Sequence, residues 1–248
     1  MLKAVESLSN RVLFYREVAL KKGSFNKVVT DYYSDIKKVA YESYHSNQIE
    51  GNKVTLGNTE RILLAQDREN IYAQHSKNDV LEVVWFAKAI RLLVEFLQRK
   101  LPLSEDLIKM LHREMTKGVT LFDAGRYRKH DVKPSGSDKV VYNRWQDVER
   151  DMTVAVNSYL KKDKNLFSIL DFKLDFILIH PFGDGNGRIS RLLLNYLLIQ
   201  NGFIPIVIKL SERDEYIATL QKASKGNYND FYIFICKKLL DEYKKIIG

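Results

Sequence analysis

The chain has 248 residues, and 45% of them are apolar, which is enough for a large hydrophobic core in one compact unit. Forty basic and 31 acidic residues give a net charge of +9, which favours an acidic partner such as a nucleotide, a nucleic acid or an acidic protein surface. The single cysteine, Cys236, excludes an internal disulfide framework, and every long apolar run is interrupted, so we expect a cytoplasmic protein without a membrane span.

Apolar residues recur at helical spacing along nearly the whole chain, which predicts an all-α helical bundle. Ser76, Ser104 and Ser211 each precede acidic residues and are expected to cap helices. The expected helices are the opening residues and then 25–48, 57–66, 76–100, 104–118, 144–162, 166–180, 188–201, 211–225 and 229–246.

One segment lacks this spacing. Residues 122–143 read FDAGRYRKHDVKPSGSDKVVYN, with a Pro-Ser-Gly-Ser turn at 134–137 between two short segments that could pair as strands. We therefore expect a small β-hairpin here.

The sequence HPFGDGNGRISR, at 180–191, separates two strongly apolar helices. Pro181 forces the chain out of the helix at His180, and Gly185 and Gly187 allow a tight turn before the chain becomes helical again at about Arg188. The N–H groups at 185–187 would then face one concavity at the positive end of a helix, which is a site for phosphate.

Charged and titratable residues lie in the same loop. Arg188 and Arg191 are three residues apart and share a helix face, so both can reach phosphate oxygens. Asp184 can hold Mg²⁺ together with phosphate oxygens and water, and His180 can accept a proton near neutral pH. Each feature alone has a structural explanation as a turn, a cap or a solvated charge, but their grouping favours a nucleotide-phosphate site.

The loop resembles the signature of the Fic family, written H-P-F-x-[DE]-G-N-G-R-x-x-R, at every fixed position. Residues 46–52, SNQIEGN, resemble the inhibitory motif of family members that are inhibited by their own N-terminal helix. The 122–143 segment resembles the family's target-binding flap, and 216–234 resembles the helices that line its adenosine pocket.

The resemblance implies transfer of AMP from ATP to a hydroxyl side chain of a target protein, with Mg²⁺ or Mn²⁺ as cofactor. It assigns His180, Asn186 and Arg188 to catalysis and Asp184 to the metal, while Phe182 anchors the loop in the core. The residues implied in nucleotide binding are Gly185, Asn186, Gly187, Arg188, Arg191 and Tyr216.

The resemblance also implies that Ser46 and Glu50 inhibit the protein. Glu50 is expected to form a bidentate pair with Arg191, and it could also orient water for removal of AMP from a modified target. The target is expected along the flap, residues 122–143, and self-modification and an oligomer are both compatible with this picture.

We expect one Fic-type unit over 1–248, with an inhibitory helical region at 1–75 and a catalytic core at 76–248. Family members that act as kinases carry Lys at the position of Gly187, so Gly187 disfavours kinase activity here. Transfer of UMP or phosphocholine instead of AMP is not excluded. A helical protein that only binds nucleotide or nucleic acid is the alternative outside catalysis, although the basic residues form no dense stripe, which disfavours nucleic acid.

Overall fold

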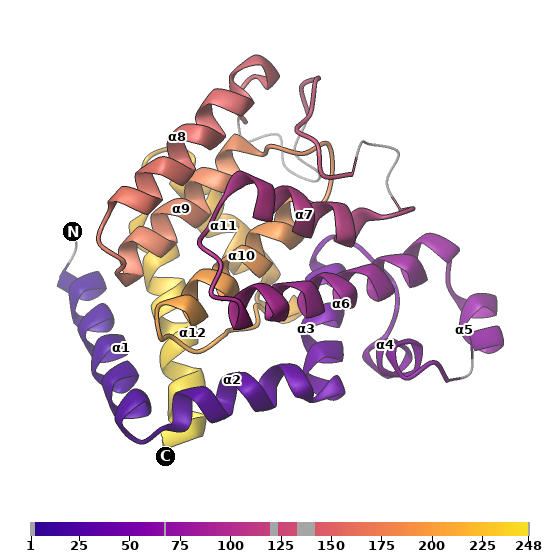
Figure 1. Ribbon diagram of the computed structural model, residues 1–248, viewed down its shortest axis with the longest axis horizontal. Coiled ribbons are helices and arrows are strands. Elements are labelled where there is room, and N and C mark those ends of the chain that lie inside the picture. The colour runs from indigo at the N-terminus through magenta and orange to yellow at the C-terminus, as the bar shows by residue number, and fades with distance from the viewer. Residues whose placement is uncertain (1–2, 67, 120–123, 133–141, 248) are drawn as a thin grey trace.

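The computed structural model describes residues 3–66, 68–119, 124–132 and 142–247, and all regular secondary structure in these ranges is helical (Figure 1). The all-α prediction is confirmed. The helices are α1 Lys3–Lys21, α2 Ser24–Ser34, α3 Ile36–Ile49, α4 Leu56–Leu63, α5 Arg68–Gln74, α6 Lys77–Gln98, α7 Glu105–Thr116, η1 Trp145–Asp147, α8 Val148–Lys161, α9 Leu166–Ile179, α10 Asn186–Gln200, η2 Leu210–Glu212, α11 Arg213–Ala223 and α12 Asn229–Ile247.

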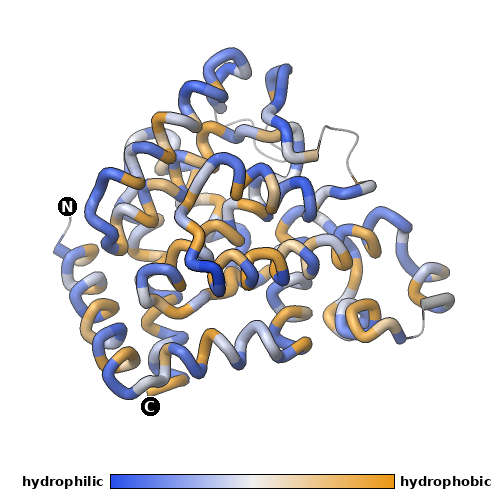
Figure 2. Tube along the Cα trace, viewed as in Figure 1, coloured by the Kyte–Doolittle hydropathy of each residue, from blue (hydrophilic) through white to orange (hydrophobic). Residues whose placement is uncertain are grey.

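Helices α9 and α10 form the centre of the molecule. Both have buried residues on nearly all sides. Helix α9 is apolar around the whole helix, whereas α10 also buries polar residues such as Asn186, Arg188 and Arg191. Helices α6, α7 and α8 pack against this pair, and Figure 2 shows the hydrophobic stretches gathered toward the middle of the molecule. The loop between α9 and α10 is therefore held at both ends by rigid, buried helices.

The first and last helices lie side by side, because α1 packs along α12 on one side of the molecule (Figure 1). On the opposite side, α4 and α5 extend away from the centre. They pack with the start of α6 around a second, smaller apolar cluster made of Val54, Ile62, Ile71, Val80 and Val83.

The predicted helix 25–48 is two helices. The backbone at Asp35 is extended, with φ −84° and ψ 111°, so this residue ends α2 and begins α3. Its carboxylate accepts a hydrogen bond from the Lys37 N–H at 2.9 Å, which is the chemistry of an N-cap. The apolar repeat continues across this N-cap, so the spacing of apolar residues alone does not predict the break.

Two of the three predicted serine caps are confirmed. Ser76 accepts from the Asp79 N–H and Ser104 accepts from the Leu107 N–H, both at 3.1 Å. The prediction for Ser211 is wrong, because this residue lies inside the short helix η2 and α11 begins after Glu212. The carboxylate of Glu212 accepts from the Lys209 N–H at 2.7 Å and closes that turn instead.

Other helices also differ from expectation. Helix α10 begins at Asn186, two residues before the predicted start, and α5 was not predicted. Half of the predicted hairpin at 122–143 lies outside the described residues, including its turn, and its described parts, 124–132 and 142–143, contain no strand. Among the described helices, none combines the length and the apolar character needed to cross a bilayer.

Candidate active site

The loop begins with an unusual backbone conformation at His180. This residue ends α9 in the left-handed region, with φ 54° and ψ 60°, which few residues other than glycine adopt. Pro181 follows, so a right-handed helical conformation is disfavoured at His180. Strain of this kind persists only where the surroundings hold it in place.

Asn186 and Phe182 brace the loop from inside. The Asn186 side chain accepts from the Phe182 N–H at 2.9 Å and donates to the Phe182 carbonyl at 2.8 Å. Phe182 is fully buried, and its ring stacks on His112 of α7 with centroids 3.7 Å apart. The prediction that Phe182 anchors the loop is confirmed, and Asn186 holds the loop backbone.

The first turn of α10 forms the predicted anion cradle with one difference. Gly185 is the N-cap at φ 76°, and the N–H groups of Asn186 and Gly187 have no acceptor within the helix. The Gly185 N–H, however, donates to the carboxylate of Asp184 at 2.6 Å. The Asp184 carboxylate therefore occupies one of the three N–H groups that were predicted to bind phosphate.

A second carboxylate, that of Glu50, lies against this cradle. A Cβ atom added to Gly187 would lie 2.2 Å from Glu50 Oε1, so this position has room for glycine only while Glu50 is there. Burial alone would raise the pKa of Glu50, but Arg191 and Arg188 outweigh it and hold the pKa below its ordinary value. Glu50 is thus an anion at the place where a phosphate is expected.

Arg191 is held by α3. Its Nε donates to Ser46 Oγ at 2.9 Å, and its second terminal nitrogen donates to the Ser46 carbonyl at 2.8 Å and to Glu50 Oε1 at 2.9 Å. The predicted pairing of Glu50 with Arg191 is present, but through one carboxylate contact and not as a bidentate pair. Ser46 accepts two further hydrogen bonds from the same guanidinium, one through its hydroxyl and one through its carbonyl.

Arg188 is paired with a residue that the sequence analysis missed. One of its terminal nitrogens lies 2.8 Å from Glu82 on α6, and the other lies 3.5 Å from Asp184. The second oxygen of Glu82 accepts from the Asn52 side chain at 2.8 Å, just beyond the end of α3. Glu82 follows α6's helical pattern in sequence, so no local signal marks it.

His180 is oriented by two contacts. Its Nδ1 lies 3.3 Å from the Ile177 carbonyl, which fixes the proton on Nδ1 and leaves Nε2 as the acceptor. The ring stacks on Tyr142, with centroids 3.8 Å apart. Burial, aided by the charge of Arg128, lowers the pKa of His180 to about 4, so the imidazole is neutral at pH 7.

These residues line one cavity of about 560 Å³, the size of a nucleotide or drug-sized ligand site. Glu50, His180, Asp184, the 185–187 turn and Arg191 border it at one end. Tyr216, Ile217 and Leu220 of α11 border it as well and supply apolar surface, consistent with a base and sugar pocket. Arg188 and Ser46 lie behind this lining.

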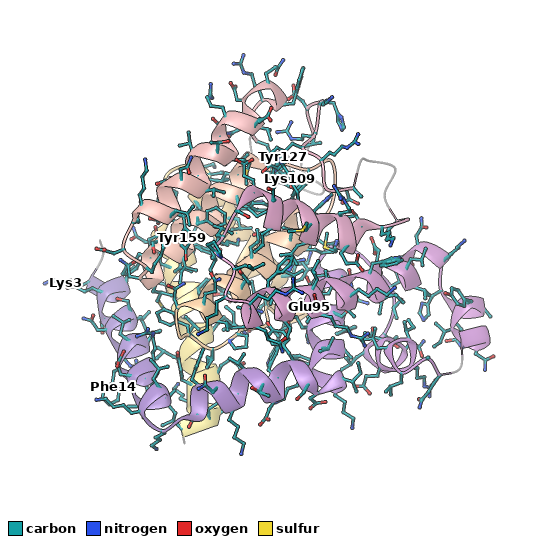
Figure 3. All side chains as sticks on the ribbon, in the orientation of Figure 1. Lys3, Phe14, Glu95, Lys109, Tyr127 and Tyr159 are labelled. Carbon is teal, nitrogen blue, oxygen red and sulfur yellow. The ribbon has the colours of Figure 1, made fainter. Side chains whose placement is uncertain are left out.

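The described base of the flap is tied to the loop. Buried Arg128 donates from Nε to the His180 carbonyl at 2.8 Å, and its N–H donates to the Pro181 carbonyl at 2.9 Å. The same guanidinium also donates to the Asn143 carbonyl, which joins the two described ends of the segment predicted to be the flap. Figure 3 shows Lys109 of α7 beside Tyr127, and Lys109 Nζ lies 4.3 Å from the centre of that ring.

Asp184 is suited to hold a divalent cation only with help from a ligand. Half of its side chain is exposed at the cavity, and Oδ1 already accepts from Gly185. Within the described ranges, no group of three or more His, Cys, Asp or Glu residues could hold a metal alone. One carboxylate beside an anion cradle fits Mg²⁺ that takes its other ligands from phosphate and water.

Comparison with known proteins places this site in a family. Residues 102–198 match the Fic/DOC family. The chain is 31% identical over 207 residues to the Nematostella vectensis protein named Protein adenylyltransferase Fic, and 32% identical over 225 residues to the Drosophila melanogaster protein of that name. These alignments cover 81% and 84% of this chain.

The fold is similar to that of Fic-1 from C. elegans, with a TM-score of 0.78 and 26% identity. That alignment covers 98% of this chain and 72% of the other. The chain spans less than half the length of the curated relatives it matches, 47% and 43% respectively.

Proposed function

Because the chain belongs to the Fic/DOC family, we propose that it transfers AMP from ATP to a hydroxyl side chain of a protein and that Glu50 inhibits this transfer. The observation that carries the proposal is the single cavity that brings together neutral His180, the α10 N-terminus and Arg191. A base, an anion cradle and a cation are the groups that nucleotidyl transfer requires.

His180 is the proposed base. The hydroxyl oxygen of the target forms a bond to the α-phosphorus of ATP, the bond to the bridging oxygen breaks, and pyrophosphate leaves. His180 Nε2 takes the hydroxyl proton, while Nδ1 keeps its own proton and donates it in a hydrogen bond to the Ile177 carbonyl. Asn186 acts by holding the loop backbone so that these groups stay aligned.

The α10 N-terminus is the proposed phosphate site. The N–H groups of Asn186 and Gly187 and the helix dipole would stabilise charge on the α- and β-phosphates. Arg191 would hold the γ-phosphate, as the family resemblance implies. The same resemblance gives the β-phosphate to Arg188, which lies behind the cavity lining and would have to leave its pair with Glu82 to reach it. Asp184 would hold Mg²⁺, which neutralises charge on the leaving pyrophosphate when bound. The base and ribose would lie against Tyr216.

Glu50 is the proposed inhibitor. It withdraws Arg191 from the γ-phosphate through the 2.9 Å ion pair and places a negative charge beside Gly187. ATP could enter this cavity only with its phosphates displaced, and a misplacement of about 1 Å can cost on the order of 10²-fold in rate. Ser46 supports the inhibition because it holds Arg191 toward α3.

The proposed partner is a protein segment in extended form along 122–143. Arg128 positions the base of this flap against the catalytic loop, so a segment bound there would present its hydroxyl to His180. We further propose self-modification and removal of AMP by a water that Glu50 orients as secondary activities. A cytoplasmic location and the division of the chain at residue 75 remain proposals.

The experiment compares ATP labelled at the α-phosphate with ATP labelled at the γ-phosphate, using Glu50→Gly protein and Mg²⁺. We expect covalent label from the first and none from the second. His180→Ala in the same background should still bind ATP and transfer nothing, because the phosphate site is made by backbone and arginines. Covalent label only from ATP labelled at the γ-phosphate would show that the protein transfers a phosphoryl group and not AMP, and would contradict the proposal.

A further inference from the structure

His112 connects two parts of the site through hydrogen bonds from opposite sides of its ring. It projects from α7 and is 1% exposed. Its Nδ1 accepts from the N–H of Gly125, at the base of the flap, at 2.8 Å. Its Nε2 lies 3.0 Å from the carbonyl oxygen of Asp184.

These partners determine the protonation state of the ring. The Gly125 N–H can only donate, so Nδ1 must be unprotonated, and the Asp184 carbonyl can only accept, so Nε2 must carry the proton. A doubly protonated imidazole would lose the bond to Gly125. Burial lowers the pKa of His112 to about 4, in agreement with a permanently neutral ring.

The bond to Asp184 fixes a peptide unit next to the proposed metal-holding carboxylate. The carbonyl of Asp184 and the N–H of Gly185 belong to the same rigid peptide plane. His112 holds the carbonyl end, and the N–H end donates to Asp184 Oδ1 at 2.6 Å. A peptide that precedes glycine can flip at low cost, and a flip would release the Asp184 carboxylate from this bond.

The bond to Gly125 fixes the flap base against α7. Gly125 has φ 76°, and a Cβ there would lie 2.7 Å from the Lys109 carbonyl, so the chain passes close to α7 at this point. Phe182 stacks on the same imidazole, so the ring contacts the loop on its face and through Nε2. One side chain thus contacts the flap base and the catalytic loop.

We propose that His112 is a positioning residue that aligns the Asp184 carboxylate and the base of the target-binding flap with each other. It contacts neither substrate nor metal and acts through the Asp184–Gly185 peptide and the Gly125 N–H. This inference rests on the proposed function, because it assigns the metal to Asp184 and the target to the flap.

Two substitutions separate the two bonds. The amide of His112→Gln reaches the place of Nε2, so it can donate to the Asp184 carbonyl while the bond to Gly125 is lost. The oxygen of His112→Asn reaches the place of Nδ1, so it can accept from Gly125 while the bond to Asp184 is lost. His75, whose ring contacts Asn58 near α5, is the matched control, changed to Gln and to Asn.

The first measurement is the affinity for Mn²⁺ by electron paramagnetic resonance, with an ATP analogue whose α,β bridge is a methylene group, in Glu50→Gly protein. The second is hydrogen exchange of the Gly125 amide. We expect His112→Asn to lose about 10-fold in Mn²⁺ affinity, since loss of a hydrogen-bond partner that orients a metal ligand typically weakens metal binding by this much. The Gly125 amide should stay protected in this variant. His112→Gln should keep the Mn²⁺ affinity and lose protection at Gly125.

Equal changes in both measurements for both variants, or no change in either, would overturn the proposal and leave His112 as a packing residue. Thermal unfolding of all four variants shows whether a loss reflects the whole fold. Neither measurement requires turnover. A Glu50→Gly parent that transfers no AMP would therefore contradict the proposed function while the two binding results still decide the role of His112.

Discussion

At the scale of single residues, His180 combines a strained backbone with a neutral side chain. Its left-handed φ of 54° is held by the Arg128 bond to its carbonyl, and its Nδ1 proton is held by Ile177. The first contact requires the guanidinium of Arg128, whereas the second uses the backbone carbonyl of Ile177 and does not depend on the side chain there. The geometry therefore leaves one defined nitrogen, Nε2, as a proton acceptor, and this nitrogen is the proposed base.

The pH dependence of the reaction tests this environment. A base works when deprotonated, so activity is lost as the pH falls through its pKa, which burial and Arg128 lower to about 4. We expect kcat/KM for AMP transfer by Glu50→Gly protein to vary little through this group between pH 6 and 8 and to fall toward pH 4. The charge of Glu50 raises the pKa of His180, so the Glu50→Gly substitution lowers this pKa further and the prediction is unchanged.

The measurement is the initial rate at low ATP across this pH range, with circular dichroism at each pH to confirm that the protein is folded. A half-maximal rate near pH 6.5, the value of an ordinary histidine, would contradict the structural environment of His180.

At the scale of elements, α3 docks on α10 through polar groups. Glu42, Ser46 and Glu50 are four residues apart on one face of α3 and its end, and they contact Asn195 and Arg191 of α10. Such an interface depends on charge and on hydrogen bonds with defined geometry. Other positions of α3 are apolar, and Val39 and Ile49 are buried in the main core.

Glu42 makes this interface sensitive to pH. Its side chain accepts from Asn195 at 3.0 Å, and burial raises its pKa to about 7 against the lowering effects of Asn195, Tyr32 and Arg191. A carboxyl group with a raised pKa in the folded state binds its proton more tightly there than in the unfolded chain. Its ionisation therefore destabilises the fold as the pH rises from about 4.5 to about 7.

Glu42→Gln should remove this loss of stability at high pH. The amide oxygen can still accept from Asn195, so we expect the variant to be more stable than the wild type at pH 8, by on the order of 1–3 kcal/mol, and about equal at pH 5. Urea unfolding of both proteins at the two pH values measures this. A stability difference that is the same at both pH values would show that Glu42 does not titrate in this range.

At the scale of the whole molecule, the sequence predicts what is local. The candidate active-site loop could be predicted because its groups lie within residues 180–191, and the helices could be predicted because their apolar residues repeat. The break at Asp35 was missed because an N-cap can interrupt a helix without interrupting its apolar pattern. The cap at Ser211 was misassigned because the short helix η2 precedes α11.

The supporting residues of the site could not be predicted, because tertiary packing brings them from distant elements. Glu82 comes from α6, His112 from α7, and Tyr142 and Arg128 from the two ends of the flap. Each looks like an ordinary charged or aromatic residue in its own segment. The pairing of Glu50 with Arg191 was anticipated only through the resemblance of residues 46–52 to an inhibitory motif.

The central claim is that this molecule transfers AMP and that α3 restrains it through Glu50. The most direct test is the rate of covalent AMP incorporation, followed by mass spectrometry, in wild type and Glu50→Gly protein at the same ATP and Mg²⁺ concentrations. Glu17→Gly, an exposed position on α1, is the matched control. We predict at least a 10-fold higher rate for Glu50→Gly than for the wild type and the Glu17→Gly control, since Arg191 and the α10 N-terminus become available to phosphate. Equal rates in the three proteins, or no AMP incorporation by Glu50→Gly protein that binds ATP, would contradict the account.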